Sequence, residues 1–222
     1  MKKIFSIIAV VIVAITNLSA QSTKTLYFEK HNTNDVLPLK YNMNRIRGGI
    51  SCTTLNADMR KLYTNIQRTE YYLADTTIGS LMTPALMLSL KVPDTDFKLF
   101  GFLEGTVGHD TELLAIVSSD GKIHDYIVAG ISTMDIKLCE FDITEDLEII
   151  TYDLLAVDKN KSVGMYDFKS VKLYRVDTTY KITKDGRFWI TKYQEYAPQT
   201  YTYEQLSDNN YHICNGNETP VR

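Results

Sequence analysis

A run of alternating β-forming residues constrains the fold of this chain more than any other feature. Residues that favour strands fall at every second position along Tyr174, Val176, Thr178, Tyr180 and Ile182, and charged residues fill most of the positions between them. Side chains of a strand point alternately to opposite faces, so this spacing puts one face on a core and the other in water. The pattern is typical of a strand in an antiparallel sheet.

Turn signals extend this pattern through the second half of the chain. An Asp-Gly pair between two strand-like runs is a strong signal for a β-hairpin, because glycine adopts positive φ without steric cost. Asp120-Gly121 and Asp185-Gly186 have this setting, and the polar Thr144–Asp146 lies between two further runs. The sequence therefore predicts a hairpin meander over residues 97–222. Its expected strands are Phe97–Leu103, Leu113–Val117, Ile123–Ile131, Lys137–Ile143, Leu147–Val157, Lys172–Ile182 and Arg187–Tyr196.

Residues 21–96 are less regular. Apolar residues recur at helical spacing from Leu55 to Ile66, which predicts one short amphipathic helix, with a pair of strands as the alternative. The apolar stretch Ile78–Leu90 is expected to pack against the sheet. No long linker divides the chain, so we expect one β-rich domain over residues 21–222. Its fold class is mainly β (α+β), with a curved antiparallel sheet, open barrel or sandwich.

The first 20 residues have the features of an export signal. Lys2 and Lys3 precede the apolar run Ile4–Ile15, and small residues lead to Ala20. The run is shorter than the roughly 20 residues that a membrane-spanning helix needs. We expect cleavage after Ala20, a periplasmic or secreted location and no stable membrane insertion. No cysteine lies at the expected cleavage site directly after the apolar run, so the signal for a lipid anchor is absent.

Charge and motifs narrow the classes of function. Without Lys2 and Lys3 the formal net charge changes from −3 to −5, and a mildly acidic chain with no basic cluster argues against nucleic-acid binding. The chain has no Gly-x-Ser-x-Gly, His-Glu-x-x-His, phosphate-binding Gly-x-x-x-x-Gly-Lys or Cys-x-x-Cys motif. These absences favour a non-catalytic protein, and no cofactor is expected.

One loop carries residues that could form a metal or acid–base site. His109 and Asp110 lie in a loop flanked by glycines, and His124 and Asp125 begin the next expected strand but one. If that neighbouring hairpin folds alongside the loop, two imidazoles and two carboxylates could bind a divalent metal or transfer a proton. The alternative, which we favour, is a polar loop with solvated charges.

Aromatic residues supply a candidate binding surface in the final third of the chain. Aromatic rings stack on the apolar faces of sugars, and tyrosines also donate hydrogen bonds, so such a group could hold a glycan or a peptide strand. Cross-strand aromatic pairing that only stabilises a sheet is the alternative. A regular strand would put Trp189 and Tyr193 on one face and Phe188, Ile190 and Tyr196 on the other. The candidate ligand-binding residues are Trp189, Tyr193, Tyr196, Tyr201 and Tyr203.

Three cysteines remain after the leader. Cys52 and Cys214 lie in polar surroundings and form a candidate disulfide in an oxidising compartment. Cys139 lies in a strand-like stretch of alternating apolar residues, which favours a buried thiol.

The two Asp-Gly hairpins also carry a resemblance. Ser119–Ile123 and Thr183–Gly186, together with long Tyr-rich strands, resemble exported β-rich proteins of Bacteroidetes with no established activity. The leader ending at Ala20-Gln21 is similar to theirs, and the likeness covers Phe97–Tyr196. The resemblance implies a compact antiparallel sheet or open barrel in a periplasmic or secreted protein. It implies no catalytic residue.

These observations favour an exported, non-catalytic β-module that binds a glycan, a peptide or an envelope protein. One alternative is a metal-dependent or hydrolytic enzyme that uses the loop of His109 and Asp110. Another is a structural or assembly component of the envelope, which would pair an exposed sheet edge with a neighbour.

Overall fold

The computed structural model describes residues 35–41, 53–54, 85–106, 109–133, 136–157 and 169–221. Within these residues the chain forms an 11-stranded sheet and a short helix. The elements are β1 (Leu39–Lys40), β2 (Thr53–Thr54), β3 (Ala85–Lys91), β4 (Phe97–Thr106), β5 (His109–Ser118), β6 (Ile123–Thr133), β7 (Ile136–Ile143), β8 (Ile149–Ala156), β9 (Ser170–Ile182), β10 (Phe188–Glu195), β11 (Gln199–Thr202) and α4 (Tyr203–Ser207).

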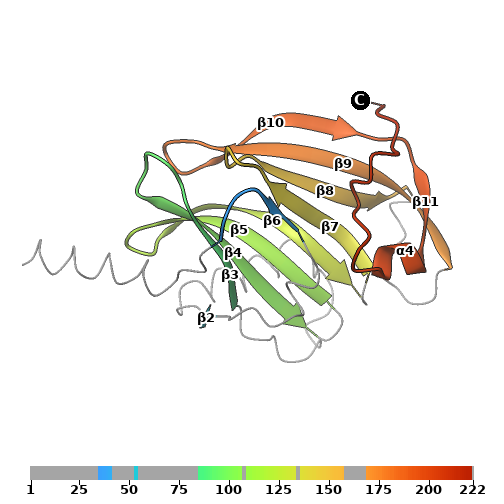
Figure 1. Cartoon of the computed structure of the whole chain (residues 1–222), viewed down its shortest axis with the longest axis horizontal. Coiled ribbons are helices and arrows are strands. Elements are labelled where there is room, and N and C mark those ends of the chain that lie inside the picture. Colours follow the sequence, from blue (N-terminus) through green and yellow to red (C-terminus); the bar gives the residue numbers. More distant parts are fainter. Residues whose placement is uncertain are drawn as a thin grey trace, which may run out of the picture.

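The sheet is an antiparallel meander. Its strand order is β10-β9-β8-β7-β6-β5-β4-β3-β2, so neighbours along the chain are neighbours in the sheet (Figure 1). β1 pairs with β7 and β11 pairs with β9 off this path. This arrangement confirms the mainly β fold class with a curved, open antiparallel sheet that the alternation and the turn signals predict.

Three hairpin turns share one hydrogen-bonding pattern. In the turn of Gly186, the Thr183 amide donates to the Arg187 carbonyl at 2.9 Å and the Gly186 amide donates to the Thr183 carbonyl at 3.0 Å. The turns at Ser118–Lys122 and Thr144–Glu148 repeat both bonds. The fourth residue of each turn has positive φ, which explains why two of them are glycine.

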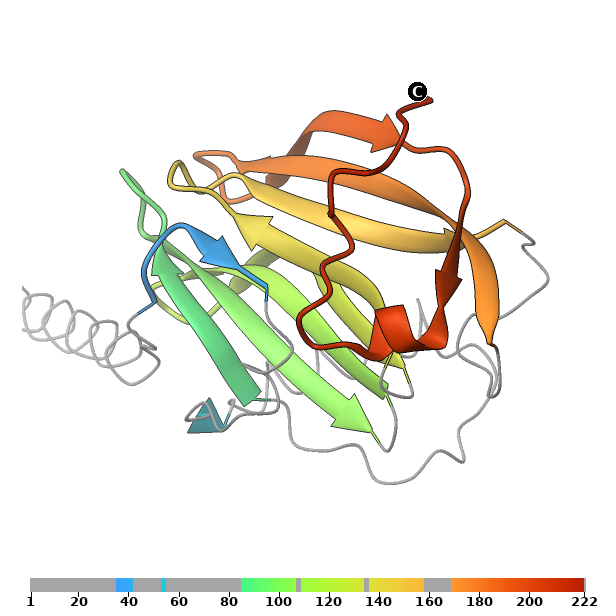
Figure 2. The same cartoon turned by 45° about the vertical axis from the view of Figure 1, so that its right-hand side comes forward.

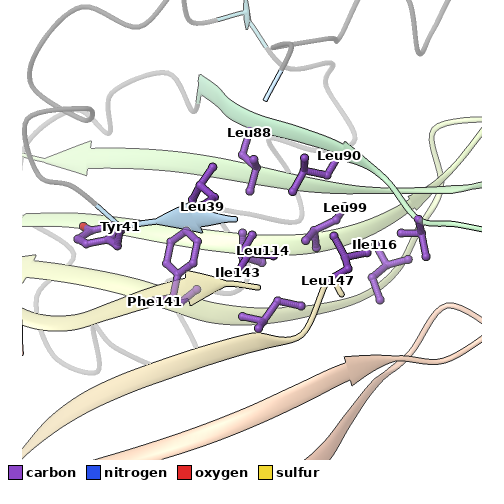
Figure 3. Packing of buried hydrophobic residues seen from close by; sticks show 13 residues of the cluster. Leu39, Tyr41, Leu88, Leu90, Leu99, Leu114, Ile116, Phe141, Ile143 and Leu147 are labelled. Carbon is purple, nitrogen blue, oxygen red and sulfur yellow. The ribbon is translucent and has the colours of Figure 1, made fainter. Parts of the chain in front are cut away.

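The sheet bends over itself where β6 and β7 part. β6 pairs with β7 only through Ile136–Cys139, whereas β1 pairs with β7 further along, at Asp142 and Ile143 (Figure 2). The main hydrophobic core lies on the inner face of this bend (Figure 3). This inner core consists of Leu39, Tyr41, Leu88, Leu90, Val92, Leu99, Leu114, Ile116, Ala129, Phe141, Ile143, Leu147 and Ile149.

Two hairpin tips meet and close one end of the bend. Arg187 Nη1 donates to the carbonyl of His124 at 3.0 Å, and the carboxylate of Asp125 accepts the amide of Phe188 at 2.9 Å. The His124 ring lies edge-on to the ring of Phe97, with 4.7 Å between centroids. These contacts join β6 to β10, although β7, β8 and β9 separate the two strands in the sheet.

The opposite, outer face of β7, β8 and β9 carries a second cluster that α4 and the C-terminal segment cover. Thr202 caps α4 in a reciprocal pair with Gln205, and Leu206 of the helix and Ile213 beyond it are fully buried. This outer cluster consists of Ile136, Tyr152, Leu154, Leu173, Tyr201, Leu206 and Ile213.

One feature differs from the sequence-based expectation, and two expected features cannot be compared with the structure. The end of Ile78–Leu90 does not pack against the sheet but enters it as β3, paired with β4. The expected leader 1–20 and the helix over 55–66 lie outside the described residues. In the described part of the chain, no helix has the length and apolar character to cross a membrane.

Candidate functional site

β10 is an edge strand with unusually exposed apolar side chains. Among the described strands it pairs only with β9, and its other side forms a border of the sheet (Figure 1). Trp189, Ile190 and Tyr193 are 67%, 54% and 50% exposed. Neighbouring apolar residues at an open sheet edge are typical of a surface for binding another chain. We call Trp189, Ile190, Lys192 and Tyr193 the β10 edge.

A β-bulge at Thr191 decides how these side chains point. Trp189 pairs with Lys181 and Ile190 with Tyr180, but Lys192 pairs with Thr179, so Thr191 has no opposite residue. Tyr193 then pairs with Thr178. Opposite residues of a pair share a face, and positions 181 and 178 on β9 point to opposite faces.

The bulge therefore corrects the sequence-based prediction that Trp189 and Tyr193 share a face. Trp189 and Lys192 lie on the outer face of β10, whereas Ile190 and Tyr193 lie on the inner face, toward the mouth of the bend. A single extra residue reverses the alternation beyond it, and the sequence carries no local signal for it.

At both ends of β10, backbone groups on the open side already form hydrogen bonds. The amide of Phe188 points away from β9 and donates to Asp125. At the other end, the carbonyl of Glu195 accepts the amide of Val221 at 2.9 Å, and the Ala197 amide donates to the carbonyl of Thr219 at 2.8 Å. The C-terminal segment thus adds a short strand to the end of β10.

The stretch between these two ends is about 20 Å long for six residues. In an antiparallel pair the backbone groups of alternate residues point to the partner and away from it. Since the amide of Phe188 points outward, the amide and carbonyl of Ile190 point outward too. The β10 edge therefore combines outward backbone groups with exposed apolar side chains.

The other three predicted aromatic residues lie outside β10. Tyr201 is buried in the outer cluster, and burial raises its pKa to about 12. The ring of Tyr196 lies beneath the guanidinium of Arg175 at 4.0 Å. Tyr203 begins α4 and is 39% exposed. The structure therefore joins only Trp189 and Tyr193 of the five predicted ligand-binding residues in the exposed strand, while the sequence analysis missed Ile190 and Lys192.

Arg175 lies at the centre of a buried charge cluster on β9. Its guanidinium pairs with Asp177 at 2.8 Å and with Glu218, and it donates to the carbonyl of Ile213 at 3.1 Å. Burial raises the pKa of Asp177, although the charge of Arg175 opposes that rise. These contacts attach the C-terminal segment to the outer face of β9, next to the end of β10.

The residues predicted to form a metal or acid–base site lie apart. His109 and Asp110 pair with Thr133 and Ser132 at one end of the β5–β6 hairpin, whereas Asp125 pairs with Ile116 near its other end. Six residues of strand between Asp110 and Ile116 span about 20 Å. Among the residues that the structure describes, no group of three or more His, Cys, Asp or Glu side chains could hold a metal ion.

His124 and Asp125 instead form the contact between the hairpin tips described above. The backbone carbonyl of His124 and the carboxylate of Asp125 are both hydrogen-bonded to the start of β10. The prediction that four side chains converge fails because antiparallel strands place the loop before β5 and the turn after it at opposite ends.

The two described cysteines differ in environment. Cys139 is buried, its thiol donates to the carbonyl of Ala129 at 3.1 Å, and burial raises its pKa. Cys214 lies exposed in the C-terminal segment and forms no disulfide with another described residue. Because Cys52 lies outside the described residues, the pairing of Cys52 with Cys214 stays a prediction.

Comparison with known proteins adds no relative: no protein-family model, curated protein or solved structure matches the chain. The resemblance to exported Bacteroidetes proteins therefore stays a prediction. The site rests on the geometry of β10 alone.

Proposed function

We propose that this protein is an exported, non-catalytic β-module that binds an extended peptide segment of a partner protein. The segment adds as a new strand to the β10 edge. The observation that carries this proposal is the combination of outward backbone groups at Ile190 with exposed Trp189, Ile190 and Tyr193 on the same open strand.

The bulge at Thr191 favours a peptide over a glycan. A sugar stacks on aromatic rings that share one face, but Trp189 and Tyr193 lie on opposite faces of β10. An added strand meets both faces at once, because its own side chains alternate between them. The geometry thus suits an extended chain better than a saccharide.

The C-terminal segment provides a precedent within the molecule. Thr219 and Val221 pair with the far end of β10 by backbone hydrogen bonds, in the manner that a partner strand would use. Pro220 and Tyr196 form the bridge between these two bonds. The border of the sheet that pairs with this C-terminal segment therefore continues along β10 into the β10 edge.

The export that we infer from residues 1–20 sets the class of partner. A module outside the cytoplasm would meet envelope or secreted proteins. The assembly role that the sequence analysis left open is a special case of this proposal, with the partner strand supplied by an envelope component.

The test uses Trp189, the only tryptophan of the chain, as a reporter. Peptides of about ten residues, in which Val alternates with Glu, Gln or Lys, are titrated into the purified protein. We expect at least one to shift the Trp189 emission in a saturable manner. Ile190→Pro removes the outward amide while leaving the bonds between β9 and β10, so binding should weaken about tenfold or more.

Ile190→Thr is the matched control, since it keeps the amide and a β-branched side chain. It should retain most of the binding. Equal binding by Ile190→Pro and Ile190→Thr would contradict strand addition. A response to neutral or anionic polysaccharides, with none to the peptides, would assign the edge to a glycan instead.

A further inference from the structure

The stretch that joins β9 to β10 has a formal charge opposite to that of the whole chain. The formal net charge of the chain is −3, yet residues 181–192 carry Lys181, Lys184, Arg187 and Lys192 against the single Asp185, a net charge of +3. All four basic side chains are exposed. Carboxylates outside this stretch lie close to it: Glu148 pairs with Lys181, Asp125 accepts the amide of Phe188, and Glu195 accepts the hydroxyl of Tyr193.

Part of this positive charge has no anion of its own. Lys181 pairs with Glu148 at 2.9 Å, and Arg187 uses one nitrogen for the carbonyl of His124. Lys184 and Lys192 form no ion pair within the described part of the chain. Asp185 accepts the hydroxyl of Thr183 at 2.6 Å inside the turn.

The basic side chain of the β10 edge lies on one face of the strand. Trp189 and Lys192 of β10 pair with Lys181 and Thr179 of β9, so all four side chains lie on the outer face. Ile190 and Tyr193 lie on the inner face. An added strand would therefore meet Lys192 and Trp189 of β10 on its outer side, and Ile190 and Tyr193 on its inner side.

Resting on the function proposed above, we propose that the partner segment is an acidic amphipathic strand. It alternates Asp or Glu, facing Lys192 and Trp189, with Val, Ile or similar residues facing Ile190 and Tyr193. Charge complementarity of this kind selects partners and speeds their encounter.

The same charges argue against a second copy of the chain as the occupant. Two β10 edges paired with each other would bring lysines together, and like charges on facing strands are destabilising. Lysine on an edge strand is a common device against such pairing. Protection against self-pairing needs only the lysines. Binding an acidic amphipathic strand uses the lysines together with the exposed side chains of Trp189 and Ile190.

The experiment compares three versions of one peptide in which Val alternates with Glu, Gln or Lys. We expect the Glu peptide to bind about tenfold more tightly than the Gln peptide, and this advantage should shrink as salt screens the charges. In the double variant Lys184→Glu/Lys192→Glu the preference should reverse toward the Lys peptide. Lys172→Glu makes the same kind of change on β9, opposite Thr200 of β11, and should leave the preference unaltered.

The outcomes separate the two proposals. Equal affinity for all three peptides would keep strand addition and overturn the acidic partner. Binding of none of them would overturn both. A concentration-dependent dimer that Ile190→Pro disrupts would assign the edge to a second copy and overturn the acidic partner as well. Circular dichroism of each variant checks that the sheet is intact.

Discussion

Leu147 has a turn conformation that glycine has in two related hairpins. Its φ is 61°, against 84° for Gly121 and 75° for Gly186, and its amide donates to Thr144 as theirs do to their own turns. A branched side chain in this region costs about 1 kcal/mol or more. The side chain of Leu147 offsets that cost because it is buried in the inner core.

Two substitutions separate the backbone cost from the packing gain. Leu147→Ala and Leu147→Gly both lose the buried side chain, and each should lower the free energy of unfolding by about 2–4 kcal/mol. In ordinary strands glycine is the worse of the two, but at this φ the alanine variant should be less stable by about 1 kcal/mol. Urea denaturation of both variants measures this order, and a less stable glycine variant would refute it.

At the scale of elements, the C-terminal segment depends on one buried arginine of β9. The side chain of Arg175 is 3% exposed and that of its partner Glu218 is 1% exposed. The guanidinium also lies over Tyr196 and holds the carbonyl of Ile213, whose side chain fills the outer cluster. The segment that pairs with the end of β10 is thus attached through Arg175.

Arg175→Met should therefore be strongly destabilising. Removal of the cation leaves Asp177 and Glu218 buried without their partner, which costs about 3–5 kcal/mol in comparable sites. Lys181→Met is the control, since it breaks only the exposed pair with Glu148 and should cost about 1 kcal/mol or less. Denaturation curves give both values, and similar losses would contradict the role assigned to Arg175.

At the scale of the whole molecule, several carboxyl groups are buried in the folded sheet. Burial raises the pKa of Glu140, Asp153 and Asp177 from their ordinary values. A group with a raised pKa binds its proton more tightly in the folded state. Its contribution to stability is therefore greatest at low pH and is lost as pH rises from about 4 through the raised pKa.

We expect these buried groups to lower the free energy of unfolding as pH rises from about 4 through their raised pKa values, because they lose their protons less readily in the folded state. Asp153→Asn removes one of them while keeping its shape beside the Thr151 hydroxyl, 3.2 Å away. The variant should be more stable than the parent near pH 7 and show a weaker dependence on pH. A parent protein whose stability rises steadily toward pH 7 would contradict this expectation.

The sequence by itself determined the repeating parts of the fold. The alternation along β9, the glycines Gly121 and Gly186 and the polar turn before Leu147 predict hairpins whose strands and turns the structure confirms. These features are local: a residue's own backbone preference and its two-residue period suffice to specify them. The same local rules could have shown that His109 and His124 lie at opposite ends of a hairpin.

Tertiary structure alone decided which residues share a surface. The bulge at Thr191 turned Tyr193 away from Trp189, the parting of β6 and β7 bent the sheet, and Asp125 became a link to β10. Each depends on residues far apart in the chain and on the packing of both faces. Trp189 is likewise exposed because β10 is an edge strand of the sheet. Burial depends on which residues pack nearby, and a local sequence pattern does not specify them.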